Sequence, residues 1–198
     1  MTAGDVFDPL EDLLVAQPER PANLGAVNLR TLTPFQRSLL VIDGTVTKFI
    51  EAYTMEPVET VRISQETRRL DSDHRWLDEP AGATLLARQV FLQGRYSGTL
   101  YAYAASLLAR SRLSQAVLEG LETNPGGIGR VMLETGLETI RELLWYGREH
   151  VDRPPAPIDR LSSGDFISRT YRIIAGGRPL MLINEKFPIP TDSLPSHH

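Results

Sequence analysis

Residues 169–187 read RTYRIIAGGRPLMLINEKF, and this stretch decides the fold. Two runs rich in β-branched, aromatic and aliphatic residues flank Gly176-Gly177, and a two-residue turn with positive φ at both central positions fits glycine best. We therefore predict a β-hairpin in which Tyr171 lies opposite Leu182. The other face of its second strand then carries four residues, which are Met181, Ile183, Glu185 and Phe187.

A second hairpin is predicted upstream of this one. Thr84 to Leu92 and Thr99 to Leu107 are both rich in strand-forming residues, and the segment from Gly94 to Gly98 joins them through a longer loop. Val58 to Gln65 alternates apolar with polar residues, which predicts a further half-buried strand. The expected sheet is therefore antiparallel.

Helices are predicted between these strands. Thr33-Pro34 is typical of a helix start, because threonine caps the first turn and proline suits the first helical position. Ser111 is expected to cap a short helix that ends at Asn124-Pro125-Gly126-Gly127, and another helix is expected from Ile128 to Arg148. Antiparallel strands interrupted by helices predict an α+β fold, an antiparallel β-sheet flanked by helices.

The chain of 198 residues is expected to form one domain, because this length suffices for a single hydrophobic core. Residues 1–31 mix proline and acidic residues with short apolar pieces, which predicts an irregular lead-in. Residues 32–188 are expected to form the domain, and residues 189–198 a flexible tail.

Composition excludes several classes of function. The net charge is −4, which argues against a protein that neutralises nucleic-acid phosphates. The chain has no cysteine, so disulfides, thiolate zinc sites and cysteine nucleophiles are excluded. His74, His150, His197 and His198 lack metal-ligand spacing, so no metal is expected. No stretch approaches the roughly 20 apolar residues that span a bilayer, so we expect a cytoplasmic protein that binds neither membrane nor nucleic acid. The sequence does not predict the oligomeric state.

Arg88 is a charged residue in an otherwise apolar row. If residues 84–92 form a strand, Arg88 shares one face with Leu86 and Val90, because alternate side chains point the same way. A buried guanidinium is costly unless it meets an anion, and its planar fork pairs best with a carboxylate. Either a protein carboxylate or the carboxylate of a bound ligand must therefore satisfy Arg88.

Glu185 is the corresponding acid of the C-terminal hairpin, in a row with Ile183 and Phe187. A carboxylate in such a place can hold a ligand hydroxyl group or take part in proton transfer. Two structural explanations stay open for the pair. Arg88 and Glu185 can simply pair with each other, or either of them can point outward at a sheet edge.

Six groups of motifs follow one another between Leu32 and Pro188. In one-letter code they read LTPFQR (32–37), DGTVT (43–47), ARQVFL (87–92), GIG (127–129), LETIRE (137–142), and RTYRII with PLMLINEKFP (169–174 and 179–188). In order and spacing this set resembles the chorismate pyruvate-lyase family. The resemblance is closer to its cyanobacterial and mycobacterial branch than to the ubiquinone-pathway enzyme.

The resemblance implies a small enclosed pocket that binds 4-hydroxybenzoate. It implies that Arg88 holds the ring carboxylate and that Glu185 contacts the hydroxyl at the other end of the ring. Backbone groups near Val46 and Ile128 would complete the substrate-binding site. The implied activity is that of a cofactor-independent carbon–oxygen lyase that eliminates pyruvate from chorismate, a cyclohexadiene carboxylate, with Arg88 and Glu185 as catalytic residues.

Two alternatives to this function stay open. The chain reads Ala104-Ala105-Ser106 where several relatives carry Ala-Glu-Ser, so an acid is missing. If that position faces the pocket, the protein can be a biosynthetic enzyme with a changed substrate. The other alternative is a non-catalytic protein that binds an aromatic acid in the same pocket.

Overall fold

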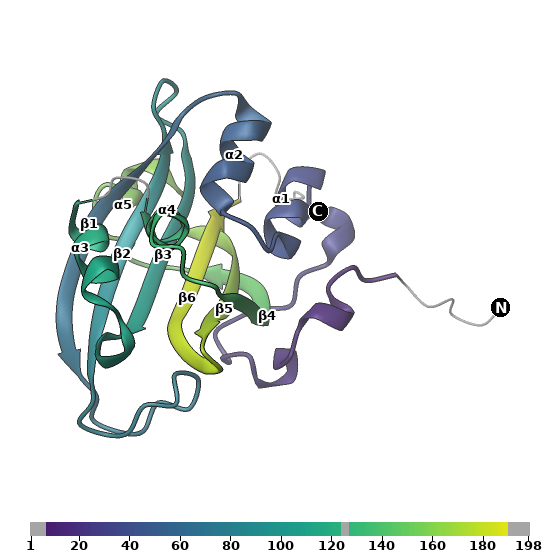
Figure 1. The fold of residues 1–198 in the computed structure, drawn as a ribbon. Coiled ribbons are helices and arrows are strands. Elements are labelled where there is room, and N and C mark those ends of the chain that lie inside the picture. Colours follow the sequence, from purple (N-terminus) through teal and green to yellow (C-terminus); the bar gives the residue numbers. More distant parts are fainter. Residues whose placement is uncertain (1–6, 124–126, 190–198) are drawn as a thin grey trace.

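The computed structural model describes residues 7–123 and 127–189, and within these ranges six antiparallel strands form one sheet (Figure 1). The strand order across the sheet is β1-β2-β3-β6-β5-β4. The strands are β1 (Val58–Arg69), β2 (Thr84–Gly94), β3 (Leu100–Ala109), β4 (Ile140–His150), β5 (Asp165–Ala175) and β6 (Arg178–Pro188). The predicted α+β class and antiparallel sheet are confirmed. Residues 190–198, most of the expected tail, lie outside the described ranges.

The α-helices of the described ranges are α1 (Pro34–Val41), α2 (Val46–Thr54), α3 (Gln115–Thr123), α4 (Gly127–Glu134) and α5 (Ile158–Leu161). α3 and α4 pack on one face of the sheet in a shared core with β2, β3, β5 and β6, and α2 packs beside them on the same face. α5 packs on the opposite face through the buried Ile158. None of these helices, in the ranges described, is long and apolar enough to cross a membrane.

The start of α1 agrees with the predicted one. The hydroxyl of Thr33 accepts a hydrogen bond from the backbone N–H of Gln36 (3.2 Å), and the Gln36 side chain accepts one from the backbone N–H of Thr33 (2.9 Å). These reciprocal bonds satisfy two backbone donors that the helix itself leaves free. They fix the point at which the chain begins to cover the sheet.

The helix expected from Ile128 to Arg148 is wrong over its second half. α4 ends at Glu134, and β4 begins at Ile140 and forms an edge strand of the sheet. Gly136 adopts a φ of 63°, and the N–H of Leu137 donates to the carbonyl of Met132 (3.2 Å). A hydrogen bond of this kind beside a left-handed glycine is typical of a helix C-terminus, so Gly136 ends α4. The apolar spacing of the segment, which is compatible with a longer helix, did not indicate this end.

The cap expected for the preceding helix is also displaced. Ser111 lies inside a short 3-10 helix, Arg110–Arg112, and α3 begins after it at Gln115. The hydroxyl of Ser114 accepts a hydrogen bond from the N–H of Val117 (3.3 Å), so Ser114 is the capping residue. The expected end of this helix, Asn124-Pro125-Gly126, lies outside the described residues.

The C-terminal hairpin turns at Gly176-Gly177 as predicted, but its register differs by one residue. A bulge at Ile173/Ile174 places Tyr171 opposite Ile183 instead of Leu182. Pro179, which lies opposite Ile174, has no N–H to donate to the ladder, so an irregularity here costs little. The shift brings Tyr171 to the same face of the sheet as Glu185.

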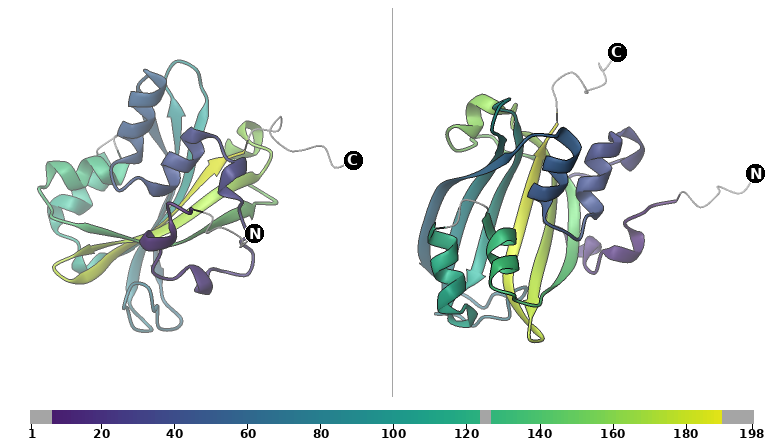
Figure 2. Two further views of the ribbon diagram at one scale, coloured as in Figure 1. Left: turned by 90° about the vertical axis from the view of Figure 1, so that its right-hand side faces the viewer. Right: turned by 45° about the horizontal axis from the view of Figure 1, so that its top comes forward.

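The segment before α1 covers the edge of the sheet at β4. Leu14 forms an isolated bridge with Leu143, and Gly25 forms one with Arg148. Leu10 and Leu24 are buried, and Figure 2 shows this segment running along the β4 side of the molecule. Unpaired strand edges favour aggregation, so this cover protects the edge.

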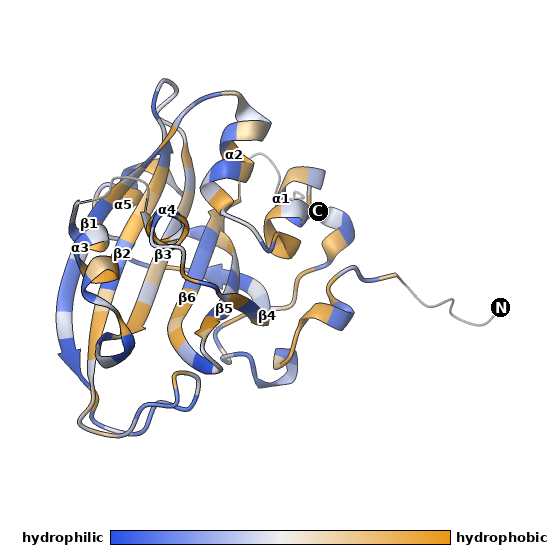
Figure 3. Ribbon diagram, in the orientation of Figure 1, coloured by the Kyte–Doolittle hydropathy of each residue, from blue (hydrophilic) through white to orange (hydrophobic). Residues whose placement is uncertain are grey.

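The inner and outer strands of the sheet differ in polarity. In Figure 3 the inner strands β2 and β3 are largely apolar, whereas the outer strand β1 is largely hydrophilic and mostly exposed along its second half. The helices α2, α3 and α4 cover one face of these apolar strands. A polar side chain buried on that face therefore needs an explanation.

Candidate active site

A cavity of about 70 Å³ lies between the helix-covered face of the sheet and the N-terminal ends of α2 and α4. All four residues singled out in the sequence line it. Arg88 comes from β2 and Glu185 from β6, while Val46 and Ile128 lie in the first turns of α2 and α4. The structure therefore brings the predicted site residues to one place.

Arg88 is 5% exposed, and no carboxylate of the described residues forms an ion pair with it. Its Nη1 donates hydrogen bonds to the side-chain oxygen of Gln65 (2.6 Å) and to the carbonyl of Leu121 in α3 (2.7 Å). Its Nε is buried and has no hydrogen-bond partner in the described part of the chain. Burial, followed by the charge of Arg62, lowers the pKa of the Arg88 guanidinium, and the charge of Glu122 opposes this only in part. An anion in the cavity would relieve this cost.

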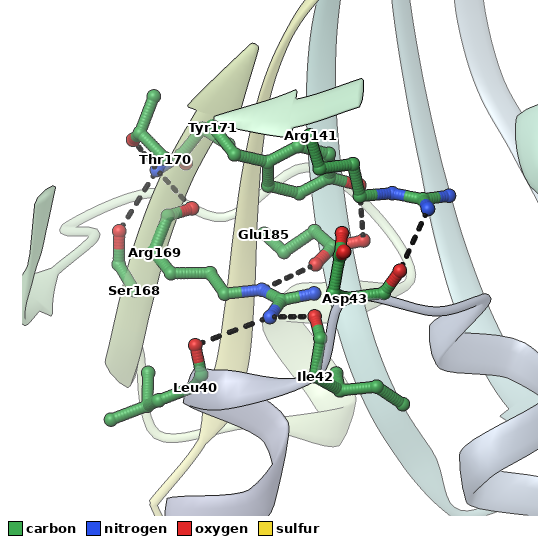
Figure 4. Close-up of polar contacts among 10 residues, drawn as sticks. Leu40, Ile42, Asp43, Arg141, Ser168, Arg169, Thr170, Tyr171 and Glu185 are labelled. Atoms are coloured by element: carbon green, nitrogen blue, oxygen red, sulfur yellow. Dashed lines mark hydrogen bonds and ion pairs between the residues drawn. The ribbon is translucent and has the colours of Figure 1, made fainter. Parts of the chain in front are cut away.

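Glu185 is held by two donors from the neighbouring strand β5 (Figure 4). Arg169 Nε donates to Glu185 Oε2 (2.9 Å), and the Tyr171 hydroxyl donates to Oε1 (3.1 Å). The idea that Arg88 and Glu185 pair with each other is therefore wrong, because Arg169 is the partner of Glu185. Each carboxylate oxygen keeps acceptor capacity, so Glu185 can still receive a ligand hydroxyl.

Tyr171 stays a hydrogen-bond donor near neutral pH. Burial, and secondly the charge of Glu185, raises the pKa of the Tyr171 phenol. Arg169 also donates through Nη1 to the carbonyls of Leu40 (3.2 Å) and Ile42 (2.9 Å) at the end of α1. Glu185 is thus a carboxylate whose position is fixed by β5 and by α1 together.

Three buried polar atoms without a hydrogen-bond partner meet at this cavity. They are Arg88 Nε, Arg141 Nε and Thr60 Oγ1. The remaining such atom of the described residues, Glu79 Oε1, lies elsewhere and is 2.9 Å from a guanidinium nitrogen of Arg112. Buried polar groups are nearly always hydrogen-bonded, so this concentration indicates a place built for a polar ligand.

The N-terminal ends of α2 and α4 approach each other closely over the cavity. A Cβ at Gly129 would lie 2.9 Å from Cγ2 of Thr45, so only glycine fits without a shift. Thr45 makes no side-chain capping bond to α2, so the first amides of that helix lack a cap from this residue. Helix N-termini carry partial positive charge, and two of them here add to the preference for an anion.

The sequence did not single out Arg141, Arg169 and Tyr171. Arg141 falls in the segment that was expected to be helical, and Arg169 and Tyr171 reach Glu185 only because of the bulge in the hairpin. Alternation along β5 with the correct register would have identified the last two. Among the described residues, no group of three or more histidine or acidic side chains is arranged to hold a metal ion.

The position of the missing family acid lies outside the cavity. Ala104 and Ser106 of β3 line the cavity, whereas Ala105 lies between Gln89 and Asn184 on the opposite face of the sheet. An acid at position 105 would therefore face away from Arg88. The departure from the family pattern does not alter the walls of the cavity.

Fold and cavity together define an α+β protein with a small pocket that two arginines, Arg88 and Arg141, line. Comparison with known families is more specific, because the family model described as "Chorismate pyruvate-lyase Rv2949c-like" matches residues 40–193. The chain belongs to this family, which confirms the resemblance found in the motifs.

Individual relatives agree with this assignment. The chain is 28% identical to a chorismate pyruvate-lyase of Mycobacterium tuberculosis over 167 residues, which cover 80% of this chain and 82% of that protein. It is also 28% identical to a chorismate pyruvate-lyase of Mycobacterium leprae over 170 residues, covering 83% and 79% of the two chains.

Solved structures share the fold. The effector domain of PhnF from Mycobacterium smegmatis has a TM-score of 0.57 at 12% identity, and the match covers 73% of this chain and 88% of that domain. The PhnF structure itself gives a TM-score of 0.59 at 12% identity, covering 78% and 67%. At such low identity the likeness concerns the architecture alone.

Proposed function

We propose that this protein is a chorismate pyruvate-lyase, which converts chorismate to 4-hydroxybenzoate and pyruvate. The observation that carries the proposal is the buried Nε of Arg88, which has no hydrogen-bond partner among the residues described and belongs to a side chain that lines the same cavity as Glu185. A ring carboxylate would fill that vacancy in the hydrogen bonding of Arg88. Family membership and relatives that bear this name support the proposal.

The reaction balances without an oxidant, a reductant or a cofactor. The ether bond between ring carbon C3 and the enolpyruvyl oxygen breaks, and its electron pair leaves with the enolpyruvate. The ring loses the proton on C4 and becomes aromatic, while enolpyruvate takes up a proton and becomes pyruvate. The protein then needs to orient the substrate and to handle a proton, which are contributions that positioned side chains make.

Arg88 and Glu185 suit the two ends of such a ring. They project from β2 and β6, which are separated by β3, so two strand spacings of ~4.8 Å place about 10 Å of sheet between them. The cavity residues of β3 are small, namely Ala102, Ala104 and Ser106. A ring can therefore lie over β3 with its carboxylate at Arg88 and its hydroxyl at Glu185.

Turnover of chorismate tests the proposal. Purified protein is incubated with chorismate, and 4-hydroxybenzoate and pyruvate are quantified together by chromatography after subtraction of spontaneous decay. We expect equal amounts of both products. Arg88→Gln should lower kcat/KM by roughly 100-fold or more, because a buried ligand carboxylate loses its cation.

Arg172→Gln is the matched control for this assay. Arg172 lies on β5 next to Tyr171, pairs with Glu142 and is not among the residues that line the cavity. Its variant should turn over chorismate like the unmodified protein. Saturable binding of 4-hydroxybenzoate without any product would instead indicate a non-catalytic binding protein or an enzyme with a changed substrate.

A further inference from the structure

Arg141 is a second arginine in the cavity, and the reaction as described above leaves it without a role. It comes from the edge strand β4, and its Nη1 donates to the backbone carbonyl of Asp43 (3.0 Å). Its Nε is buried without a hydrogen-bond partner, and no carboxylate of the described residues forms an ion pair with it. Arg141 therefore resembles Arg88 in having a buried Nε whose hydrogen bond is not made within the described residues.

The two arginines approach the cavity from opposite sides. β2 and β4 are separated by β3, β6 and β5, so four strand spacings place about 19 Å of sheet between the strands that carry Arg88 and Arg141. Figure 4 shows Arg141 beside Tyr171 and on the same side as Glu185. The charge of Arg141 also opposes the rise in the pKa of the Tyr171 phenol, which reflects the same proximity.

A ligand with one carboxylate can satisfy only one of these arginines. A ligand with two carboxylates, one at each end, can satisfy both. Glu185 forms its ion pair with Arg169 and accepts a hydrogen bond from Tyr171, so the charge of Glu185 is already balanced by Arg169 and not by Arg141. The cavity thus has two separate positions for anions, with the ring hydroxyl site of Glu185 next to the second.

We propose that Arg141 binds a second carboxylate of the substrate and makes the cavity selective for dicarboxylates. This inference rests on the proposed function for the identity of the substrate, because chorismate carries one carboxylate on the ring and one on the enolpyruvyl group. Cleavage removes the second carboxylate from the ring. The aromatic product then keeps its contact with Arg88 but loses the one with Arg141, so Arg141 distinguishes substrate from product.

Two unreactive ligands separate this role from a structural one. 3-(Carboxymethoxy)benzoate and 3-methoxybenzoate share the ring carboxylate and an ether oxygen at the ring position that corresponds to C3 of chorismate, and only the first has a second carboxylate. Their dissociation constants are measured by titration calorimetry for the unmodified protein and for Arg141→Gln. We expect Arg141→Gln to weaken the dicarboxylate about 10-fold or more and the monocarboxylate by less than about 2-fold.

Two further variants serve as controls. Arg148→Gln removes an arginine of the same strand that pairs with Asp165 outside the cavity, and it should leave both affinities unchanged. Arg141→Lys keeps the positive charge and should recover part of the affinity for the dicarboxylate. It also provides a folded variant if Arg141→Gln proves unstable in thermal melts.

The outcomes discriminate between explanations. If Arg141→Gln weakened the affinity for both ligands equally, Arg141 would only tether the Asp43 backbone, and the proposal would be overturned. Unchanged affinity for both, or a wild-type protein that does not prefer the dicarboxylate, would overturn it as well. If the dicarboxylate preference depends on Arg141 but chorismate is not converted, the proposed lyase reaction fails while the recognition of a dicarboxylate stands.

Discussion

Arg88 and Glu185 are both charged residues in apolar rows, yet the protein satisfies them differently. Glu185 has two strong donors, Arg169 and Tyr171, whereas Arg88 contacts only neutral oxygen atoms. Glu185 is therefore a positioned acceptor and Arg88 a cation that lacks an anion. This difference orients an asymmetric ligand, with its carboxylate at Arg88 and its hydroxyl at Glu185.

Replacement of Arg169 by methionine tests how Glu185 is held. Arg169 is 1% exposed, so Arg169→Met leaves a buried carboxylate without its cation. Removal of one partner from a buried pair costs about 3–5 kcal/mol, and we expect a loss of that size in the free energy of unfolding. Urea denaturation measures it.

The control for this prediction is Arg172→Met on the same strand. Arg172 and Glu142 are each about a quarter exposed, at 24% and 27%, so their ion pair contributes much less. If Arg169→Met were as stable as Arg172→Met, the Arg169 pair would not be what positions Glu185.

Single residues were predictable where one strand face carries an anomaly. Alternation alone indicated Arg88 and Glu185, because each interrupts an apolar row within its own strand. The partner of Glu185 was not predictable in the same way. Arg169 lies opposite Glu185 on the neighbouring strand, and the bulge at Ile173/Ile174 decides which residues face each other.

At the level of elements, the N-terminal ends of α2 and α4 form the cover of the cavity. The cavity measures about 70 Å³. A cavity of roughly 150 Å³ is known to hold benzene, so a substituted ring needs more room than this cavity offers. We therefore expect the first turns of α2 and α4 to adjust when a ligand binds.

Gly129→Ala tests this close approach of the two helices. The added methyl would meet Cγ2 of Thr45 at 2.9 Å and hold α2 and α4 apart. We expect a several-fold weaker affinity for 4-hydroxybenzoate, measured by titration calorimetry. Helix propensity would not explain such a loss of affinity, because alanine stabilises a helix by about 1 kcal/mol relative to glycine.

A second substitution shows whether the contact itself is responsible. Thr45→Ser removes Cγ2 and keeps the hydroxyl, so the double variant Thr45→Ser with Gly129→Ala should regain most of the lost affinity. Thr45→Ser alone serves as the reference. Equal affinities for the single alanine variant and the unmodified protein would show that the cover tolerates a wider spacing.

Elements with strong local signals were predictable, and those decided by a single turn were not. The Thr33 cap with Pro34 and the glycine turn at Gly176-Gly177 act locally, so the sequence indicated both. The segment that became β4 has apolar spacing compatible with a helix. Only Gly136 and the pairing with β5 convert it into a strand, and that conversion is what brings Arg141 to the cavity.

At the scale of the whole molecule, charge is distributed unevenly. The chain has a net charge of −4, but among the described residues no carboxylate forms an ion pair with Arg88 or Arg141 of the cavity, while Arg169 and Glu185 neutralise each other. The cavity is therefore cationic within an acidic protein. A dianionic ligand would balance it, whereas a neutral ring would leave both guanidinium groups unsatisfied.

The sheet is the common support for all of these groups. Arg88, Glu185 and Arg141 lie on β2, β6 and β4, and their relative positions depend on the strand order of the complete sheet. Neighbouring strands in space are distant in sequence here, since β3 pairs with β6. For this reason the fold class followed from local patterns, while the composition of the site required the assembled sheet.

The central claim is that a ring lies in this one cavity, between Arg88 and Glu185. A crystal structure of the protein with bound 4-hydroxybenzoate tests it most directly. We expect the ring over β3, its carboxylate within hydrogen-bond distance of Arg88 Nε and its hydroxyl within hydrogen-bond distance of Glu185. A ligand bound elsewhere on the protein, or in the cavity with its carboxylate at Glu185, would contradict the account.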